Sequence, residues 1–133
     1  MALLIDTDVL IDLERGVGAQ AVETVLGDEE RAISVITVSE LLHGVLRATG
    51  ARRARRRAFV EYLLGALRGI PITEPVARVH AEVWAQLAKR GEVIGAHDLW
   101  IAATALAHGL GLATNNAAEF AHVPGLRLID VSA

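Results

Sequence analysis

The 133-residue chain contains no cysteine, a single lysine and few aromatic residues, which make up 4% of it. A chain without cysteine forms neither a disulfide nor a thiolate metal site, and it suits a reducing compartment. No apolar run approaches the roughly 18 residues that are needed to span a bilayer. We therefore expect a soluble, cytoplasmic protein that is neither disulfide-stabilised nor built around a zinc–thiolate site.

Small aliphatic residues are the most abundant hydrophobic residues of the chain. Hydrophobic residues make up 53% of the chain, so the core has to be built from alanine, leucine, valine and isoleucine. The length predicts one domain over residues 1–133. The excess of small aliphatic residues also suggests that a second subunit or a partner covers some apolar surface.

The net charge of −3 argues against general affinity for nucleic acid, but the arginines are unevenly distributed. Six of them lie in one short segment: Arg47, Arg52, Arg53, Arg55, Arg56 and Arg57. This segment is either a solvated helix face, or a contact surface for RNA phosphates or for an acidic segment of a partner protein. Arg15, directly after the first expected helix, is a further candidate for contact with a phosphate.

Short apolar segments alternate with segments of helical periodicity along the whole chain. We predict strands over residues 2–6, 32–36, 70–72, 110–114 and 126–130. Helices are expected between them, the first ending at Gly16 and the fifth beginning near Pro75. Alternating strands and helices indicate a parallel sheet covered on both faces. The expected fold is a single-domain, three-layer α/β/α structure.

Acidic and amide residues follow several of these strands or begin the next helix: Asp6, Glu40, Asp98, Asn115, Asn116 and Glu119. In parallel sheets the binding crevice lies outside the carboxyl ends of the strands. The pattern therefore predicts that carboxylates distant in sequence meet at one edge of the sheet.

Each of these residues also has a structural interpretation. Asp6 or a neighbouring residue could cap the first helix. Thr37 and Glu40 have the spacing of a capping box, and Asn116 stands in a similar relation to Glu119. These interpretations do not explain why several acids should gather at one edge of a sheet.

Other polar residues nearby are expected to be structural. Asp8 lies near the acids but is expected to cap or support them. Asp12 is expected to face water or to pair with an arginine, and His43 to be partly buried on its helix.

Gathered carboxylates repel one another at neutral pH unless a cation lies between them. Carboxylate oxygens suit Mg²⁺ or Mn²⁺, which are commonly shared with a phosphate ligand. We therefore expect a Mg²⁺ or Mn²⁺ site at this edge of the sheet, with a carboxylate available to accept a proton from water.

Four segments in this order, LLIDTDVLID, ISVITVSELLHG, AHDLWIAATALAHG and LATNNAAEF followed by VPGLRLID, resemble the PIN-domain family. The chain is similar in particular to the VapC-type toxins of bacterial toxin–antitoxin pairs, over essentially its whole length. The resemblance implies a metal-dependent endoribonuclease that forms a homodimer and is neutralised by a cognate antitoxin protein.

The resemblance also implies roles for individual residues. Asp6, Glu40 and Asp98 match the acidic metal-binding positions and, with Glu119, form the expected catalytic set. Asn116 stands where many family members have a further aspartate, so either Asn116 is a metal ligand or Glu119 substitutes for the missing acid. The same resemblance makes Thr114, beside the site, a candidate for contact with substrate. Asn115 and Arg15 are expected near the substrate as well.

Two other functions are compatible with parts of the sequence. LLIDTDVLID also resembles the opening of haloacid-dehalogenase-like phosphohydrolases, but these need a downstream lysine, and Lys89 lies in the middle of a predicted helix. The second alternative is a catalytically silent binding module that has the PIN fold without metal affinity.

Overall fold

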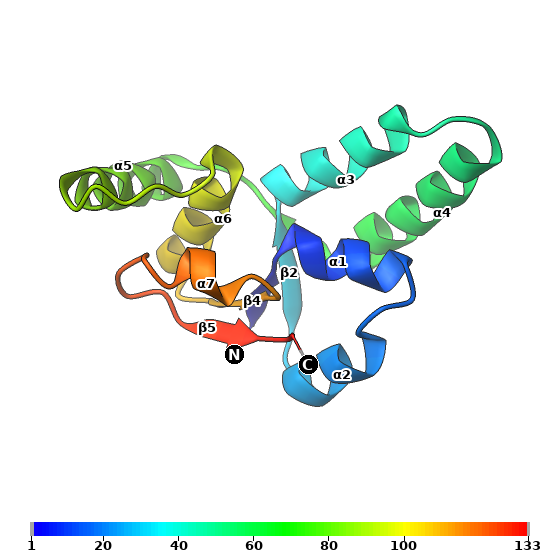
Figure 1. The fold of residues 1–133 in the computed structure, drawn as a ribbon, viewed down its shortest axis with the longest axis horizontal. Coiled ribbons are helices and arrows are strands. Elements are labelled where there is room, and N and C mark those ends of the chain that lie inside the picture. The colour runs from blue at the N-terminus through cyan, green and yellow to red at the C-terminus, as the bar shows by residue number, and fades with distance from the viewer. Residues whose placement is uncertain (1, 133) are drawn as a thin grey trace.

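A five-stranded parallel sheet forms the centre of the protein in the computed structural model, which describes residues 2–132 (Figure 1). The strand order is β3-β2-β1-β4-β5, and every neighbouring pair is parallel. The strands are β1 (Leu3–Ile5), β2 (Arg31–Ser34), β3 (Arg68–Ile70), β4 (Gly111–Thr114) and β5 (Leu128–Asp130).

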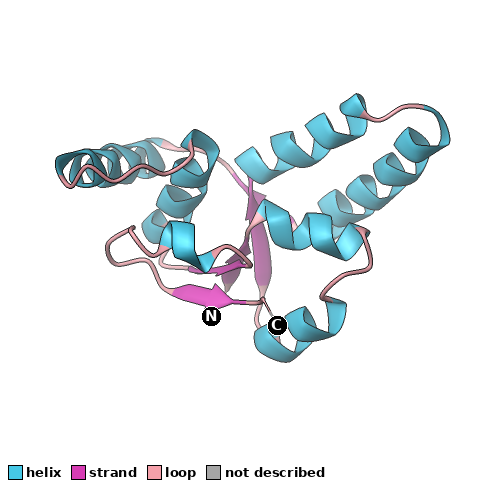
Figure 2. Cartoon of the chain, in the orientation of Figure 1, coloured by secondary structure: helices cyan, strands magenta, loops and turns pink. Residues whose placement is uncertain are grey.

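Helices cover both faces of this sheet (Figure 2). One face packs against α1 (Thr7–Glu14), α2 (Ala19–Leu26), α3 (Val35–Arg47) and α4 (Gly50–Ala66). The other packs against α5 (Glu74–Lys89), α6 (Ala96–Ala107) and the short α7 (Ala117–Phe120). The predicted three-layer α/β/α fold with a central parallel sheet is confirmed. None of the helices within residues 2–132 has the length and apolar character to cross a membrane.

Alternating side chains along the strands build two separate cores. Leu3 and Ile5 of β1 belong to the core beneath α1–α4, whereas Leu4 belongs to the core beneath α5–α7. This two-residue period is the expected geometry of a strand with both faces buried. All three side chains are at most 3% exposed, so the short central strand is anchored from both sides.

Every strand differs from its sequence-based expectation by one or two residues at an end, and two of these differences have a clear local cause. The predicted strand 32–36 ends at Ser34, whose Oγ accepts a hydrogen bond from the Ile36 backbone N–H (3.0 Å) and so caps α3. The predicted strand 70–72 lies two residues earlier and ends before Pro71, which has no N–H for the ladder. In both places local backbone chemistry sets where the strand ends.

The strand order changes direction at β1, because the chain places β2 and β3 on one side of it and β4 and β5 on the other. Such a switch point opens a crevice at the carboxyl ends of the two central strands. β1 ends before Asp6 and β4 ends at Thr114, so these residues lie at the crevice.

The small helix α7 is held to the sheet by Phe120, which is 1% exposed and belongs to the core beneath α5–α7. We expect Phe120→Ala to lower the free energy of unfolding by roughly 3–5 kcal/mol, because it removes a fully buried ring. Phe59→Ala is the matched control, since Phe59 only packs against the edge of the opposite core and is partly exposed. Urea unfolding should show the smaller loss for Phe59→Ala, and an equal or larger loss would contradict this account of the core.

Candidate metal and active site

Asp6 is fixed at the crevice by the end of the neighbouring strand. Its side chain is only 2% exposed, and Thr114 Oγ1 donates a hydrogen bond to Asp6 Oδ2 (2.8 Å). The Thr114 hydroxyl in turn accepts from the Asn116 backbone N–H (2.9 Å). Asp6 occupies the N-cap position of α1 but makes no side-chain capping bond. Its carboxylate is therefore available in the crevice and does not cap the helix.

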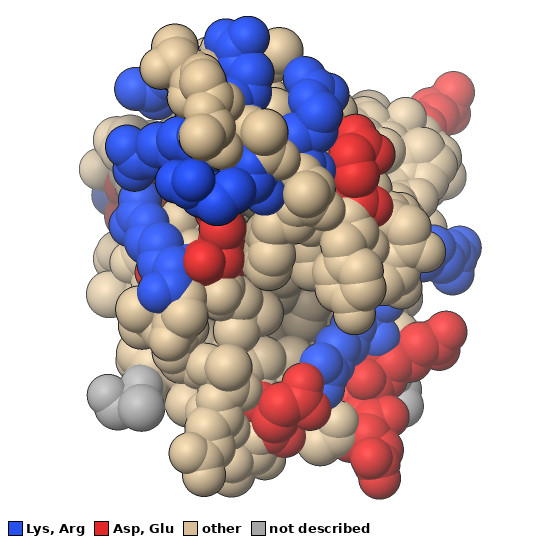
Figure 3. Space-filling view, turned by 90° about the vertical axis from the view of Figure 1, so that its right-hand side faces the viewer, with Lys and Arg blue, Asp and Glu red and all other residues tan. Residues whose placement is uncertain are grey.

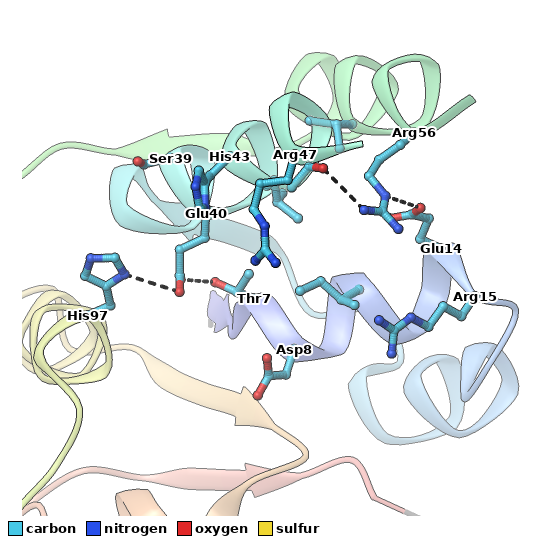
Figure 4. A pocket seen from close by; sticks show the side chains of 14 residues that line it. Thr7, Asp8, Glu14, Arg15, Ser39, Glu40, His43, Arg47, Arg56 and His97 are labelled. Carbon is cyan, nitrogen blue, oxygen red and sulfur yellow. Dashed lines mark hydrogen bonds and ion pairs between the residues drawn. The ribbon is translucent and has the colours of Figure 1, made fainter. Parts of the chain in front are cut away.

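Glu40 approaches Asp6 from α3, one turn into the helix. The Thr7 hydroxyl donates to Glu40 Oε1 (2.7 Å) and lies 2.9 Å from the Thr37 hydroxyl. His97 Nδ1 lies 3.4 Å from the other oxygen of Glu40 (Figure 4). The expected capping box is wrong, because Ser34 caps α3 and Thr37 is buried inside it. Glu40 is thus free of a helix-capping role and is oriented by a buried threonine pair.

Asp98 and Glu119 form a carboxyl pair on the other side of the crevice. Asp98 lies in the first turn of α6, and Glu119 comes from α7. Glu119 Oε1 accepts from the Gly95 backbone N–H (3.0 Å), and its Oε2 accepts from Asn116 Nδ2 (2.8 Å). A side chain at Gly95 would begin 3.5 Å from Glu119 Oε1 and 3.6 Å from Asp98 Oδ2. These are ordinary contact distances, so the pair is supported by the Gly95 backbone N–H and does not depend on the missing side chain.

The acids influence one another's protonation, which shows that they share one electrostatic environment. Burial raises the pKa of Asp6 from 3.8 to about 6, and the charges of Asp8 and Glu40 add to the effect. Burial, a hydrogen bond with Glu119 and the surrounding negative charges raise the pKa of Asp98 to about 8. Partial burial and the charges of Glu40, Asp12 and Glu119 also raise the pKa of Asp8. At neutral pH the Asp98–Glu119 pair therefore retains a proton.

A pocket of about 620 Å³ opens beside these acids between α1 and the α3–α4 hairpin (Figure 4). Thr7, Asp8 and Glu40 line one end of it, Arg47 and Arg15 line its walls, and the Glu14–Arg56 ion pair lies at the far end. A ligand that fills the pocket therefore contacts both carboxylates and guanidinium groups.

The donor atoms that converge here are carboxylate oxygens, the ligands that Mg²⁺ and Mn²⁺ prefer. Asp6, Glu40, Asp98 and Glu119 are the residues that could hold such an ion. As they stand within residues 2–132, no three of them meet at one point closely enough to ligate an ion. Metal coordination by three of them would require their side chains to move from these positions.

The other predicted site residues have specific positions. Thr114 is fully buried and its hydroxyl is engaged by Asp6, so in this conformation it orients Asp6 and is closed to substrate. Asn115 Nδ2 donates to Asp12 Oδ2 (2.6 Å), which links the turn after β4 to α1. The expectation that Asp12 faces water or pairs with an arginine is therefore wrong. His43 is exposed and lines the pocket, contrary to the expected partial burial.

Sequence reasoning does not identify the residues that orient the acids. It suggests Thr7 and Thr37 only as helix caps, yet they form the buried contact that holds Glu40. Nothing in the local sequence distinguishes these threonines from helix caps, because the contact joins residues 30 positions apart. Asp8 and His97, which flank predicted acids in sequence, also belong to the immediate surroundings of the site.

Comparison with known proteins gives a consistent result. The PIN domain family model matches residues 3–126. The chain is 36% identical over 133 residues to "Ribonuclease VapC1" of Rickettsia felis, covering 99% of this chain and 98% of that protein. It is 32% identical over 105 residues to "tRNA(fMet)-specific endonuclease VapC" of Salmonella typhimurium, covering 79% and 78% of the two chains.

A solved structure shares the whole fold. It is a member of the VapBC family of toxin-antitoxin systems, VapBC-5, from Mycobacterium tuberculosis. The TM-score is 0.82 at 32% sequence identity, with 97% of this chain and 98% of that chain covered. The protein therefore belongs to the PIN-domain family and, within it, to the VapC group.

Proposed function

We propose that the protein is a Mg²⁺- or Mn²⁺-dependent endoribonuclease that acts in the cytoplasm as the toxin of a type II toxin–antitoxin pair. The observation that carries this proposal is the convergence of carboxylates from four separate chain segments at the β1–β4 crevice of a PIN-family fold. The raised pKa values of Asp6 and Asp98 support it, because burial and the neighbouring negative charges disfavour the ionised acids without a cation. The names of the curated relatives support RNA as the substrate.

Asp6, Glu40 and Asp98 are the proposed metal ligands, with Glu119 as the fourth acid. Asn116 donates to Glu119 and does not itself carry a charge, which favours Glu119 over Asn116 as the replacement for the missing aspartate. A bound Mg²⁺ or Mn²⁺ would lower the pKa of a water molecule and offset charge that develops on the phosphate.

The chain's own residues position these groups and handle protons. Thr114 hydrogen-bonds Asp6 and Thr7 hydrogen-bonds Glu40, so both carboxylates are held at the crevice before a metal binds. In the absence of metal the Asp98–Glu119 pair retains one proton at neutral pH. Once a bound metal had displaced that proton, a carboxylate of the site would be free to accept a proton from the attacking water.

We also propose two protein partners, a cognate antitoxin and a second copy of this chain. The related VapBC structure is described as a toxin–antitoxin system, which supports a cognate antitoxin protein. A homodimer is supported by exposed apolar side chains beside α5, since Trp84 is 61% and Val93 is 88% exposed.

Of the two alternative functions, one is overturned and one is left to the activity test. A haloacid-dehalogenase-like phosphohydrolase is overturned by the PIN-family match over residues 3–126. A catalytically silent PIN-fold binding module would retain the fold without cleaving RNA, and the activity test below distinguishes it.

Asp6→Asn and Asp98→Asn should each lower RNA cleavage by at least about 100-fold in Mg²⁺ or Mn²⁺, because each removes a charged oxygen from the proposed metal site. Asp28→Asn is the matched control, since Asp28 is exposed in the turn after α2. Cleavage of structured RNA by purified protein, with and without EDTA, measures the effect. Wild-type activity in either site variant would contradict the assignment, and a wild-type chain inactive with both metals would favour the silent binding module.

The raised pKa of Asp98 predicts a pH-dependent stability in the absence of metal. The folded-state pKa of about 8 lies above the ordinary 3.8, so the stability that this group contributes is present below pH 3.8 and is lost as the pH rises through 8. Asp98→Asn mimics the neutral form at every pH. Its melting temperature should match that of wild type near pH 4 and exceed it by about 3–6 °C at pH 8.5. Solvent screens the half-exposed carboxyl, so the difference stays below what the full pKa shift would give.

Thermal unfolding in EDTA over pH 4–8.5 checks this difference, with Asp28→Asn as the control. Added Mn²⁺ should then stabilise wild type more than Asp98→Asn. A difference in melting temperature that is the same at every pH would show that ionisation of Asp98 does not destabilise the fold.

A further inference from the structure

We propose that Arg15, Arg47 and Arg52 form a subsite that binds the phosphates of a single-stranded RNA segment next to the bond to be cleaved. The inference rests on the proposed nuclease function and adds to it a positioning site that adjoins the carboxylates. It separates the six clustered arginines and Arg15 into groups with different roles.

A second hollow, of about 320 Å³, adjoins the carboxylate pocket and is lined by Arg15, Arg47, Arg52 and Arg56. Arg15, Arg47 and Arg56 also line the carboxylate pocket itself, so the two spaces are continuous. The four arginines come from the end of α1, the end of α3 and one face of α4. Figure 3 shows this basic surface gathered on the side of the molecule that carries the α3–α4 hairpin.

Two arginines of the cluster have structural partners. Arg56 Nε donates to Glu14 Oε1 (2.9 Å), and both side chains are about one-fifth exposed. Arg53 donates to the backbone oxygens of Ala48 (2.6 Å) and Leu46 (2.9 Å) and so closes the end of α3. These contacts hold α4 against α1 and α3, and they take two guanidinium groups out of consideration as RNA ligands.

Arg15, Arg47 and Arg52 differ from these two. Within residues 2–132, none of them has a carboxylate within ion-pair distance or a hydrogen-bond partner for its side chain. Arg15 and Arg47 point their guanidinium groups into the pocket from opposite walls (Figure 4). Three unpaired cations around one hollow repel one another, and a polyanion relieves that repulsion.

A phosphate chain is the occupant that fits both ends of this surface. The acidic crevice and the net charge of −3 repel RNA at long range, so an RNA strand needs a cationic surface close to the reacting phosphate. Guanidinium groups offer a planar pair of donors that matches a phosphate. An acidic peptide would also be attracted to the arginines, but its carboxylates would compete with those of the site for the metal and would gain nothing further from the crevice.

The test compares two triple variants with equal changes in charge. Arg15→Gln, Arg47→Gln and Arg52→Gln are combined in one protein. Arg55→Gln, Arg57→Gln and Arg90→Gln are combined in the control, because these arginines are exposed and do not line the hollow. Binding of a 12-nucleotide single-stranded RNA is measured in EDTA at several salt concentrations, which prevents cleavage from entering the result.

The subsite variant should weaken RNA binding at least tenfold at low salt. It should also reduce the slope of log affinity against log salt by about 2, because each of three phosphates that are no longer neutralised contributes about 0.7. The control should retain the wild-type slope. In Mn²⁺, the subsite variant should raise KM for the 12-nucleotide RNA more than it lowers kcat, whereas the control variant should change neither.

Equal weakening of RNA binding in the two variants would overturn the inference, because it would indicate only general charge. An unchanged RNA slope together with abolished binding of a polyglutamate peptide would also overturn it, in favour of an acidic protein partner. Failure of the proposed nuclease function is distinguishable from both, since it would appear as a wild-type chain that cleaves no RNA in Mn²⁺, whatever the binding slopes.

Discussion

Repulsion among carboxylates at the β1–β4 crevice is the constraint on which the rest of the site depends. Asp6 is buried at the end of the central strand, and Glu40, Asp98 and Glu119 approach it from three different helices. Such an arrangement is unfavourable by itself, because burial and, after it, the neighbouring negative charges raise the pKa values of Asp6 and Asp98. The fold maintains it through neutral donors: the Thr114 and Thr7 hydroxyls and the Gly95 backbone N–H. A fold that retains this unfavourable charge in a crevice is consistent with binding a cation there.

The fold and the positions of the acids are predictable because they follow from short-range patterns. Apolar strands with helices between them fix a parallel sheet, and a parallel sheet brings its strand ends to one edge. Asp6 and Asp98 can therefore be placed from the sequence. Prediction fails where two local interactions compete for the same residues. Ser34, one residue before the helix, takes the capping role that the spacing of Thr37 and Glu40 suggests.

Contacts between distant side chains are beyond the reach of sequence reasoning. The link from Asn115 to Asp12 spans more than 100 residues, and no local pattern indicates it. The same holds for the arginine-rich segment, where spacing alone cannot distinguish Arg56, paired with Glu14, from Arg52, which faces the hollow. The choice depends on where α1 lies against α4, and that is a property of the assembled core.

The central claim is that a cation takes the place of a proton held among these acids. Calorimetric titration of the protein with Mn²⁺ at pH 7, in buffers of different ionisation enthalpy, tests it most directly because it counts the protons released on binding. The account predicts the release of about one proton per site in wild type and none in Asp98→Asn, since the Asp98–Glu119 pair holds that proton in the absence of metal. Metal binding without proton release, or equal release in both proteins, would contradict it.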